Sequence, residues 1–188
     1  MKSSTVSEDG VVVTLEKDTA IKVIDNSKDF SDVADSFWAG DSIDFVTARE
    51  IFSGTSATTF TPDGYMTRQA MWMVLARMSG EDPTDMTQAK YWAIENGISD
   101  GSDPTNAVTR QQFVTMLWRW HGAPESDHSV DHHTDAHTIS NYADEAVAWA
   151  VEHGIKGGYD DGTLRPHGTA TRAHVATFIQ RFYENVER

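Results

Sequence analysis

The sequence contains no cysteine among its 188 residues, so neither a disulfide framework nor thiol chemistry is available to it. Basic residues are also scarce, because 15 lysines and arginines stand against 29 aspartates and glutamates and leave a net charge of -14. That charge repels nucleic acid and argues against a general basic patch. We find neither a hydrophobic run long enough to span a membrane nor a signal peptide, and we expect the chain to be a fragment of a longer exported protein.

What the chain does contain is an internal repeat built on a Thr-Arg pair. The pair occurs as Thr67-Arg68, Thr109-Arg110 and Thr171-Arg172. Each threonine is preceded by a proline at position -5 and followed by an arginine at +10 and by apolar residues at +4, +7, +8 and +11. The apolar sets are Met71, Val74, Leu75 and Met78, then Phe113, Met116, Leu117 and Trp120, then Val175, Phe178, Ile179 and Phe182. Three copies in one register indicate tandem units.

The apolar spacing is that of an amphipathic helix, and the threonine stands at the N-cap position. We therefore predict helices that begin within about two residues of Thr67, Thr109 and Thr171, with apolar faces that converge on one core. An arginine in the first turn of a helix is unfavourable next to the positive end of the helix dipole. Because this arginine recurs in all three copies, we infer that it has a function. An arginine beside the unpaired N–H groups of a helix start would form an anion site suited to carboxylates.

A second helix is predicted before each pair. Residues 91–101 and 148–158 align as short helices that carry Trp92 or Trp149 and end at a glycine. In the first copy, residues 44–54, Phe45 replaces the tryptophan and Glu50 replaces the first glycine. A loop rich in glycine and aspartate follows, and it is five residues shorter in the second copy than in the third.

Together with Phe30-Ser31-Asp32-Val33, these motifs resemble the S-layer homology (SLH) family, whose repeat reads Phe-x-Asp-Val, Trp-Ala, Gly-Ile-x-x-Gly, Asp-Gly-x-Phe-x-Pro and Thr-Arg-Ala-Glu. The resemblance covers residues 30–183 and implies a mainly α fold, a pseudo-threefold bundle of three helix-loop-helix repeats. The family's glutamate after Thr-Arg-Ala is absent from all three copies.

The resemblance also implies a function. It points to a non-catalytic module, secreted to the cell wall or surface of a Gram-positive-type bacterium, that tethers a larger exported protein. Grooves between the repeats would bind an anionic, pyruvylated secondary cell-wall polysaccharide without a cofactor. Carried over residue by residue, the groove residues are Arg68, Arg110, Arg172, Trp92, Trp149, Gly101, Gly158 and Asp161. Because the third copy is the most complete, we predict the largest contribution from Arg172 and a smaller one from Arg68.

The repeats predict a division of the chain into four segments. Residues 1–29 form a small N-terminal β element or the end of an upstream domain, since β-branched runs at 11–15 and 20–24 read as a strand pair. Residues 30–82, 83–122 and 123–188 form the three repeats. The third repeat holds an insertion, because its threonine lies 62 residues after the second one, against 42 between the first two.

The insertion carries four weak candidates for metal ligands, His128, His132, His133 and His137. Imidazole and carboxylate suit zinc or nickel, but no recognised ligand motif is present, so we assign no metal and interpret the segment as a solvated, dispensable loop. Two other function classes remain open. An enzyme could use Glu152, His153, Asp160 and Asp161, although no such pair recurs. A protein-interaction or surface-assembly module could use the same grooves.

Overall fold

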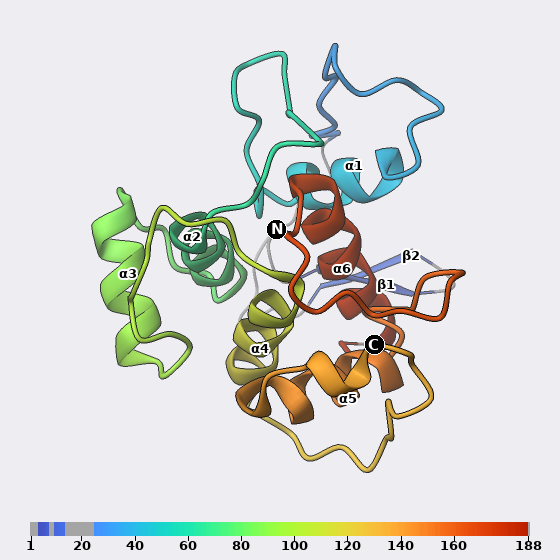
Figure 1. The fold of residues 1–188 in the computed structure, drawn as a ribbon. Helices are drawn as coiled ribbons and strands as arrows, with labels where there is room; N and C mark the ends of the chain where they lie inside the picture. Colours follow the sequence, from blue (N-terminus) through green and yellow to red (C-terminus); the bar gives the residue numbers. More distant parts are fainter. Residues whose placement is uncertain (1–3, 8–9, 14–24, 188) are drawn as a thin grey trace.

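The computed structural model describes residues 4–7, 10–13 and 25–187 (Figure 1). The fold is mainly helical, which confirms the predicted class. Its α-helices are α1 (Gly40–Ala48), α2 (Arg68–Met78), α3 (Met86–Glu95), α4 (Arg110–Trp120), α5 (Asp144–Glu152) and α6 (Arg172–Asn185). Two short 3-10 helices, η1 (Ala136–Thr138) and η2 (Asn141–Ala143), precede α5. No helix within the described ranges is long and apolar enough to cross a membrane.

The Thr-Arg helices begin as predicted. Thr67, Thr109 and Thr171 are the N-caps of α2, α4 and α6, and each side chain accepts a hydrogen bond from the N–H three residues later. A threonine hydroxyl at this position satisfies one of the donors that a helix start otherwise leaves without a partner. The local sequence is therefore sufficient to place all three helix starts.

The helices pack in three pairs, α2 with α3, α4 with α5, and α6 with α1 (Figure 1). The first helix of each sequence unit thus packs against the Thr-Arg helix of the unit before it, and α1 packs against the last one. The beginning and the end of the bundle are joined by this final pair, which closes the three pairs into a ring. Each packed pair therefore combines parts of two sequence repeats.

A closed set of backbone hydrogen bonds lies at the centre of the ring. The N–H of Met66 donates to the carbonyl of Ala170 at 3.0 Å, that of Ala170 donates to Val108 at 2.9 Å, and that of Val108 donates to Met66 at 2.7 Å. Each residue stands one position before its capping threonine. The three connecting segments are thereby related by the predicted pseudo-threefold arrangement.

The apolar faces of the three Thr-Arg helices meet in one core, as predicted. Met71, Phe113 and Val175 are fully buried and belong to a single hydrophobic cluster. The rings of Phe113 and Phe178 lie 5.4 Å apart between α4 and α6. Because every helix contributes to this cluster, the repeats form one folding unit and not three separate ones.

Two aspartates tie the start of a repeat to its own loop. Asp32 accepts the N–H of Phe60 at 2.8 Å and that of the following residue at 2.7 Å, and Asp135 accepts the N–H of Leu164 and that of its successor, both at 2.7 Å. Burial alone would raise the pKa of each carboxyl, but these donors outweigh it and hold both pKa values below 3.8. The Phe-x-Asp-Val opening and its counterpart at Asp135 therefore serve a structural purpose.

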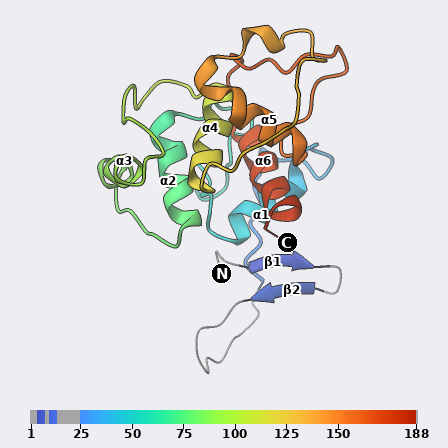
Figure 2. The same ribbon diagram turned by 90° about the horizontal axis from the view of Figure 1, so that it is seen from below.

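The N-terminal β element differs from the prediction. Strands β1 (Ser4–Ser7) and β2 (Gly10–Val13) pair antiparallel, with Ser4 opposite Val13 (Figure 2). The run at 11–15 thus overlaps a strand, but its partner precedes it in the sequence. The predicted partner at 20–24 lies outside the described residues.

Glu50 occupies a backbone conformation that suits glycine. Its φ is 58°, close to the 67° of Gly97 and the 63° of Gly154, which end α3 and α5 in the same way. Since a side chain in this region costs about 1 kcal/mol, we expect Glu50→Gly to raise the free energy of unfolding by roughly that amount. Urea denaturation would measure it. Glu50→Ala, which keeps the Cβ, is the matched control, and an equal gain in both variants would contradict the backbone explanation.

Candidate ligand-binding grooves

The N–H groups at the starts of the Thr-Arg helices are already taken. In α2, Arg68 donates to the carbonyl of Asn106 at 3.0 Å and Gln69 to that of Pro104 at 2.9 Å, while Ala70 donates to Thr67. The other two helices repeat the first two bonds, to Gly168 and Pro166 for α4 and to Gly64 and Pro62 for α6. The predicted anion site of unpaired N–H groups is therefore wrong, because another repeat supplies the acceptors. The three recurring prolines lie at this contact, and each supplies one of the accepting carbonyls.

The arginine side chains reach into the loop of a different repeat. Arg68 meets residues 99–102, Arg110 lies in one cavity with residues 156–159, and Arg172 meets residues 53–60. This corrects the predicted grouping, in which Arg172 shared a groove with Gly158 and Asp161 of its own repeat. We name the three surroundings the Arg68, Arg110 and Arg172 grooves.

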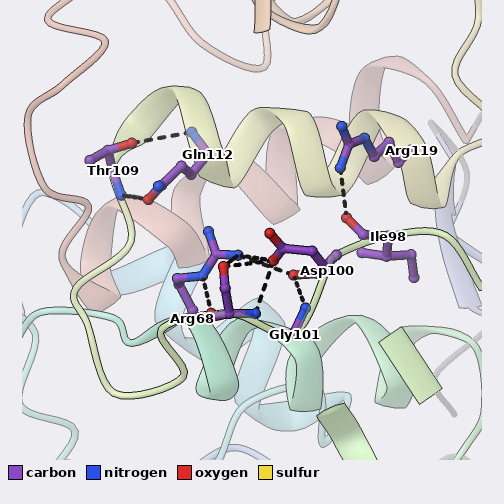
Figure 3. A network of polar contacts seen from close by, with 9 residues as sticks. Arg68, Ile98, Asp100, Gly101, Thr109, Gln112 and Arg119 are labelled. Atoms are coloured by element: carbon purple, nitrogen blue, oxygen red, sulfur yellow. Dashed lines mark hydrogen bonds and ion pairs between the residues drawn. The ribbon is translucent and has the colours of Figure 1, made fainter. Parts of the chain in front are cut away.

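In the Arg68 groove the protein supplies acceptors for two nitrogens of the guanidinium, Nε and Nη2 (Figure 3). Its Nε donates to the carbonyl of Ser102 at 2.8 Å, and its Nη2 donates to Asp100 Oδ1 at 2.9 Å and to Ser99 Oγ at 3.2 Å. Hydrogen bonds from Ser102, with the charge of Arg68, hold the pKa of Asp100 below its usual value, so Asp100 is charged at neutral pH. The cavity here measures about 380 Å³ and also includes Tyr142.

In the Arg110 groove the guanidinium lacks such partners. Arg110 is only 9% exposed, and its Nε is buried without an acceptor. Its guanidinium carbon lies 5.5 Å from the ring centre of Tyr159. A methyl group on Gly168 would collide with Arg110 Nη1, so the glycine makes room for the arginine. The groove forms a cavity of about 380 Å³, which is large enough for a small ligand group.

A second cation lies beside Arg110 in the same cavity. Lys156 is 1% exposed, and its Nζ donates to the carbonyl of Leu164 at 2.7 Å. Burial, with the charge of Arg110, lowers the pKa of Lys156 to about 8. An ammonium group has three donors, and only one has an acceptor here. Within the described part of the chain no carboxylate lies within ion-pair distance of either cation.

His174 of α6 adds a polar side chain to the Arg110 groove. Burial, with the charge of Arg110, lowers the pKa of its imidazole below 6.5, so the ring is neutral at pH 7. The N–H of Thr171 donates to its Nδ1 at 3.4 Å, in a capping box. The Oγ1 of Thr171 also lies 2.7 Å from Nδ1, so Nδ1 is engaged by the protein and Nε2 is the ring nitrogen left for a ligand.

In the Arg172 groove the protein itself engages the arginine, which does not line the cavity of about 490 Å³ next to Phe52, Ser53 and Gly54. Arg172 Nε donates to the carbonyl of Phe60 and Nη2 to that of Ser53, both at 2.7 Å, and the guanidinium carbon lies 4.4 Å from the ring centre of Phe60. The helix positions that carry Gln112 or His174 in the other grooves carry Ala70 here. The arginine predicted to contribute most is thus engaged by its own protein.

An exposed aromatic side chain stands at the mouth of two grooves. Trp38 is 60% exposed, and its ring centre lies 5.4 Å from that of His174 in the Arg110 groove. Tyr142 is 49% exposed and receives a hydrogen bond from Gln111 in the Arg68 groove. Each directly precedes the alanine N-cap of its helix, α1 or α5, and Thr84 holds the corresponding place before α3. The third groove therefore lacks the aromatic residue.

The remaining predicted site residues lie outside the centres of the grooves. Trp149 is 1% exposed and stacks on His121 in the core, so its ring is inaccessible to a ligand. Trp92 is half-buried against the core on α3. Asp161 accepts hydrogen bonds from Thr163 and Arg165 of its own loop, and these bonds lower its pKa to about 2. Its carboxylate therefore stabilises the loop itself.

The two predicted glycines have different surroundings. A Cβ on Gly101 would touch Lys90 and Ile94 of α3, whereas one on Gly158 would touch His133 of the insertion. Only Gly158 lines a groove cavity, that of Arg110. Gly101 therefore allows close packing of the loop on a helix and contributes no surface to the Arg68 cavity.

Sequence reasoning missed Lys156, Trp38, Tyr142 and His174. A signal for Lys156 was available, since a lysine follows the buried Ile155 where the other copies have Ser99 or Phe52. Trp38 and Tyr142 occupy equivalent positions before a helix, but the segments that precede them align poorly. Their exposure depends on the packing of other repeats.

The histidine insertion packs against the body of the protein. Val130 contacts the hydrophobic core, and both the backbone N–H of Thr134 and Nδ1 of His133 lie within hydrogen-bond distance of the Gly162 carbonyl. The interpretation as a solvated loop without core contacts is therefore wrong, and deleting residues 126–133 would remove these contacts. Among the described residues, no three histidine, aspartate or glutamate side chains are placed to hold a metal ion.

Comparison with known proteins agrees with the repeat pattern. The S-layer homology domain family matches residues 29–71 and 134–176. An endoglucanase of Bacillus sp. (strain KSM-635) is 29% identical over 174 residues, covering 82% of this chain and 18% of the endoglucanase. An amylopullulanase of Thermoanaerobacterium thermosulfurigenes is 26% identical over 178 residues, covering 84% and 10%. A cellulosome-anchoring protein of Acetivibrio thermocellus is 29% identical over 85 residues, covering 44% and 19%. The chain spans less than a fifth of the length of these relatives.

Proposed function

We propose that this chain, which matches the S-layer homology domain family at residues 29–71 and 134–176, anchors a larger exported protein to the bacterial cell surface by binding an anionic secondary cell-wall polysaccharide. The polymer's charged substituent, of the pyruvate ketal type, enters the Arg110 groove. The module does this without catalysis, and the wall is of the Gram-positive type.

The observation that carries this proposal is the unpartnered charge in the Arg110 groove. A guanidinium that is nine-tenths buried without an acceptor for its Nε is costly unless something else supplies one. A carboxylate matches the planar fork of arginine in charge and geometry. Although the whole chain carries a charge of -14, the residues that line this cavity include Arg110, Lys156 and Arg181 and no aspartate or glutamate, so attraction is local.

The aromatic residues support a sugar as the carrier of that anion. Trp38 and Tyr142 are large apolar surfaces left exposed beside polar groove walls, and an indole or phenol ring can stack on the apolar face of a pyranose. Hydroxyl and amide groups at Thr177, Thr115 and Gln112 line the same cavities and suit sugar hydroxyls. The two grooves with these features would act together on one long polymer, which raises the overall affinity.

The relatives support a modular role. Each matches this chain over a small part of its own length, and their names range from endoglucanase to cellulosome-anchoring protein. A segment shared by proteins with such different names fits a common attachment module better than a common reaction. We therefore place catalysis, where the whole protein has any, outside these repeats.

A pull-down on cell walls tests the proposal. Purified sacculi that retain their secondary polysaccharide should retain the protein, and sacculi stripped of that polymer should retain at least tenfold less. Polymer from which the ketal has been removed by mild acid is the matched control for the charged substituent. Equal retention on stripped sacculi would contradict the polymer as ligand and would favour a protein partner in the grooves.

A further inference from the structure

The Arg68 and Arg110 grooves are built from corresponding parts of the fold but differ at two consecutive positions. Both loops start from a buried isoleucine, Ile98 or Ile155. The next two residues are Ser99-Asp100 in one loop and Lys156-Gly157 in the other. The arginine, the flanking helix and the aromatic residue at the mouth have counterparts in both. The main difference in charge therefore comes from these two positions, together with Asp103, which also lines the Arg68 cavity.

In the Arg68 groove the protein supplies its own anion. The carboxylate of Asp100 lies 2.9 Å from Arg68 Nη2 and is held in place by the N–H and the hydroxyl of Ser102, at 2.9 and 2.8 Å (Figure 3). A ligand carboxylate would have to displace it and would meet its negative charge. An uncharged sugar would not be repelled by this carboxylate.

In the Arg110 groove the corresponding position is empty of side chain. Gly157 has no Cβ, and a Cβ built there would have no heavy atom within 4 Å apart from its chain neighbours. The preceding residue adds Lys156, whose ammonium has one protein acceptor. The Nε of Arg110 has none. The same architecture therefore presents two buried cations with unused donors, and among the described residues neither of them forms an ion pair with a carboxylate.

We propose that the residue pair after the buried isoleucine determines the charge of the ligand that each groove accepts. Lys156-Gly157 makes the Arg110 groove a site for an oxyanion, whereas Ser99-Asp100 makes the Arg68 groove a site for an uncharged sugar. This inference rests on the proposed function only in taking the occupants to be parts of a polysaccharide. It assigns Lys156 as a direct contact to the anion and Asp100 as the residue that excludes one.

Reciprocal substitutions test the proposal. Gly157→Asp places a carboxylate beside Arg110 in open space, so we expect the affinity for methyl 4,6-pyruvylated hexoside to fall at least tenfold. Gly157→Asn, which has the same size and no charge, should lose less than threefold. Asp100→Gly should create a second site, with perturbed amide signals at Ser99 and Ser102 in an NMR titration. The parent should show perturbation only around residues 156–159.

The same titration contains the contradicting outcomes. Equal losses in Gly157→Asp and Gly157→Asn would show that space and not charge matters. If Asp100→Gly fails to fold, Asp100→Asn keeps an acceptor for Ser102 and replaces it as the test. A folded variant without a second anion site would overturn the assignment of Asp100. The uncharged methyl hexoside should perturb the Arg68 groove in the parent, and perturbation of the Arg110 groove alone would contradict the other half of the proposal.

The contact from Lys156 predicts that the affinity of the Arg110 groove for an anion depends on pH. The charged and titratable groups that face this lysine or line its cavity are Arg110 of α4, His174 and Arg181 of α6, Asp135 before η1 and Tyr159 of the same loop. Because the ammonium loses its proton near pH 8, affinity for the pyruvylated hexoside should decrease as the pH rises from about 7 to about 9. Lys156→Met should bind more weakly and show no such decrease. An unchanged affinity across this range in the parent would contradict the contact.

Failure of this inference is distinguishable from failure of the proposed function. If the pyruvylated hexoside binds at residues 156–159 but sacculi do not retain the protein, the groove chemistry holds and the anchoring role is wrong. If sacculi retain the parent and Gly157→Asp equally, while retention depends on the polymer, anchoring holds and the charge assignment is wrong.

Discussion

Arg110→Ala is expected to weaken binding of the wall polysaccharide about ten- to hundredfold, the loss of one charge-assisted bidentate pair worth about 1.5 to 3 kcal/mol. The free energy of unfolding should stay the same or rise, because the substitution removes a buried cation whose Nε has no protein acceptor. Calorimetric titration with polymer fragments would measure the affinity, and chemical denaturation the stability. Arg110→Lys, which keeps the charge without the fork, should fall between the parent and alanine.

Arg172→Ala is the matched comparison and should behave in the opposite way. The guanidinium of Arg172 donates to two backbone carbonyls, both at 2.7 Å, and packs on Phe60. Its loss should lower the free energy of unfolding by about 2 to 4 kcal/mol, while the folded variant should bind the polymer nearly as well as the parent. A binding loss at Arg172 equal to that at Arg110 would contradict the distinction between an arginine without protein acceptors and one that the protein engages.

Trp149→Ala is expected to destabilise the protein by about 3 to 5 kcal/mol, the cost of removing a large buried aromatic side chain. Trp149 is fully enclosed, and its ring lies 5.7 Å from His121 and 6.3 Å from Phe182 between centres. Below its lowered melting temperature the variant should still bind the polymer, since the ring does not reach a groove. Thermal unfolding followed by circular dichroism would measure the loss.

Trp38→Ala is the control for that substitution, with the opposite distribution of effects. Because most of its side chain is exposed, the stability should change by no more than about 0.5 kcal/mol. Polymer binding should fall instead, as expected for a lost stacking surface next to His174. A stable Trp38→Ala variant with undiminished binding would remove the aromatic residue from the site.

The residues around the Thr-Arg pairs show how far local sequence could be used. A threonine cap acts within about one helical turn, and an apolar spacing is recognisable over about three turns. Both signals are local, so the three helix starts were predicted correctly at Thr67, Thr109 and Thr171. The apolar faces also identified the shared core, because a helix face that is apolar must be buried somewhere. Three equal registers were enough to indicate the repeat.

The site depended on contacts that local rules do not specify. An apolar face says that a helix is buried but not which neighbour covers it, so the pairing of α1 with α6 was not predictable from either segment. The same holds for the arginines, since each crosses to a loop of another repeat, and Arg110 alone among the three meets a loop that leaves it without acceptors.

The sequence by itself determined the repeat, the capped helices and the amphipathic faces, because these follow from interactions between residues a few positions apart. Tertiary structure decided which tryptophan is buried, which arginine is available and which charges share a cavity. Trp149 belongs to α5 and Trp38 directly precedes α1, so both lie at the first helix of a repeat. In the folded protein Trp149 is enclosed, whereas Trp38 remains exposed at a groove mouth. Burial and charge pairing are sums over neighbours from distant parts of the chain, and only the folded arrangement supplies those neighbours.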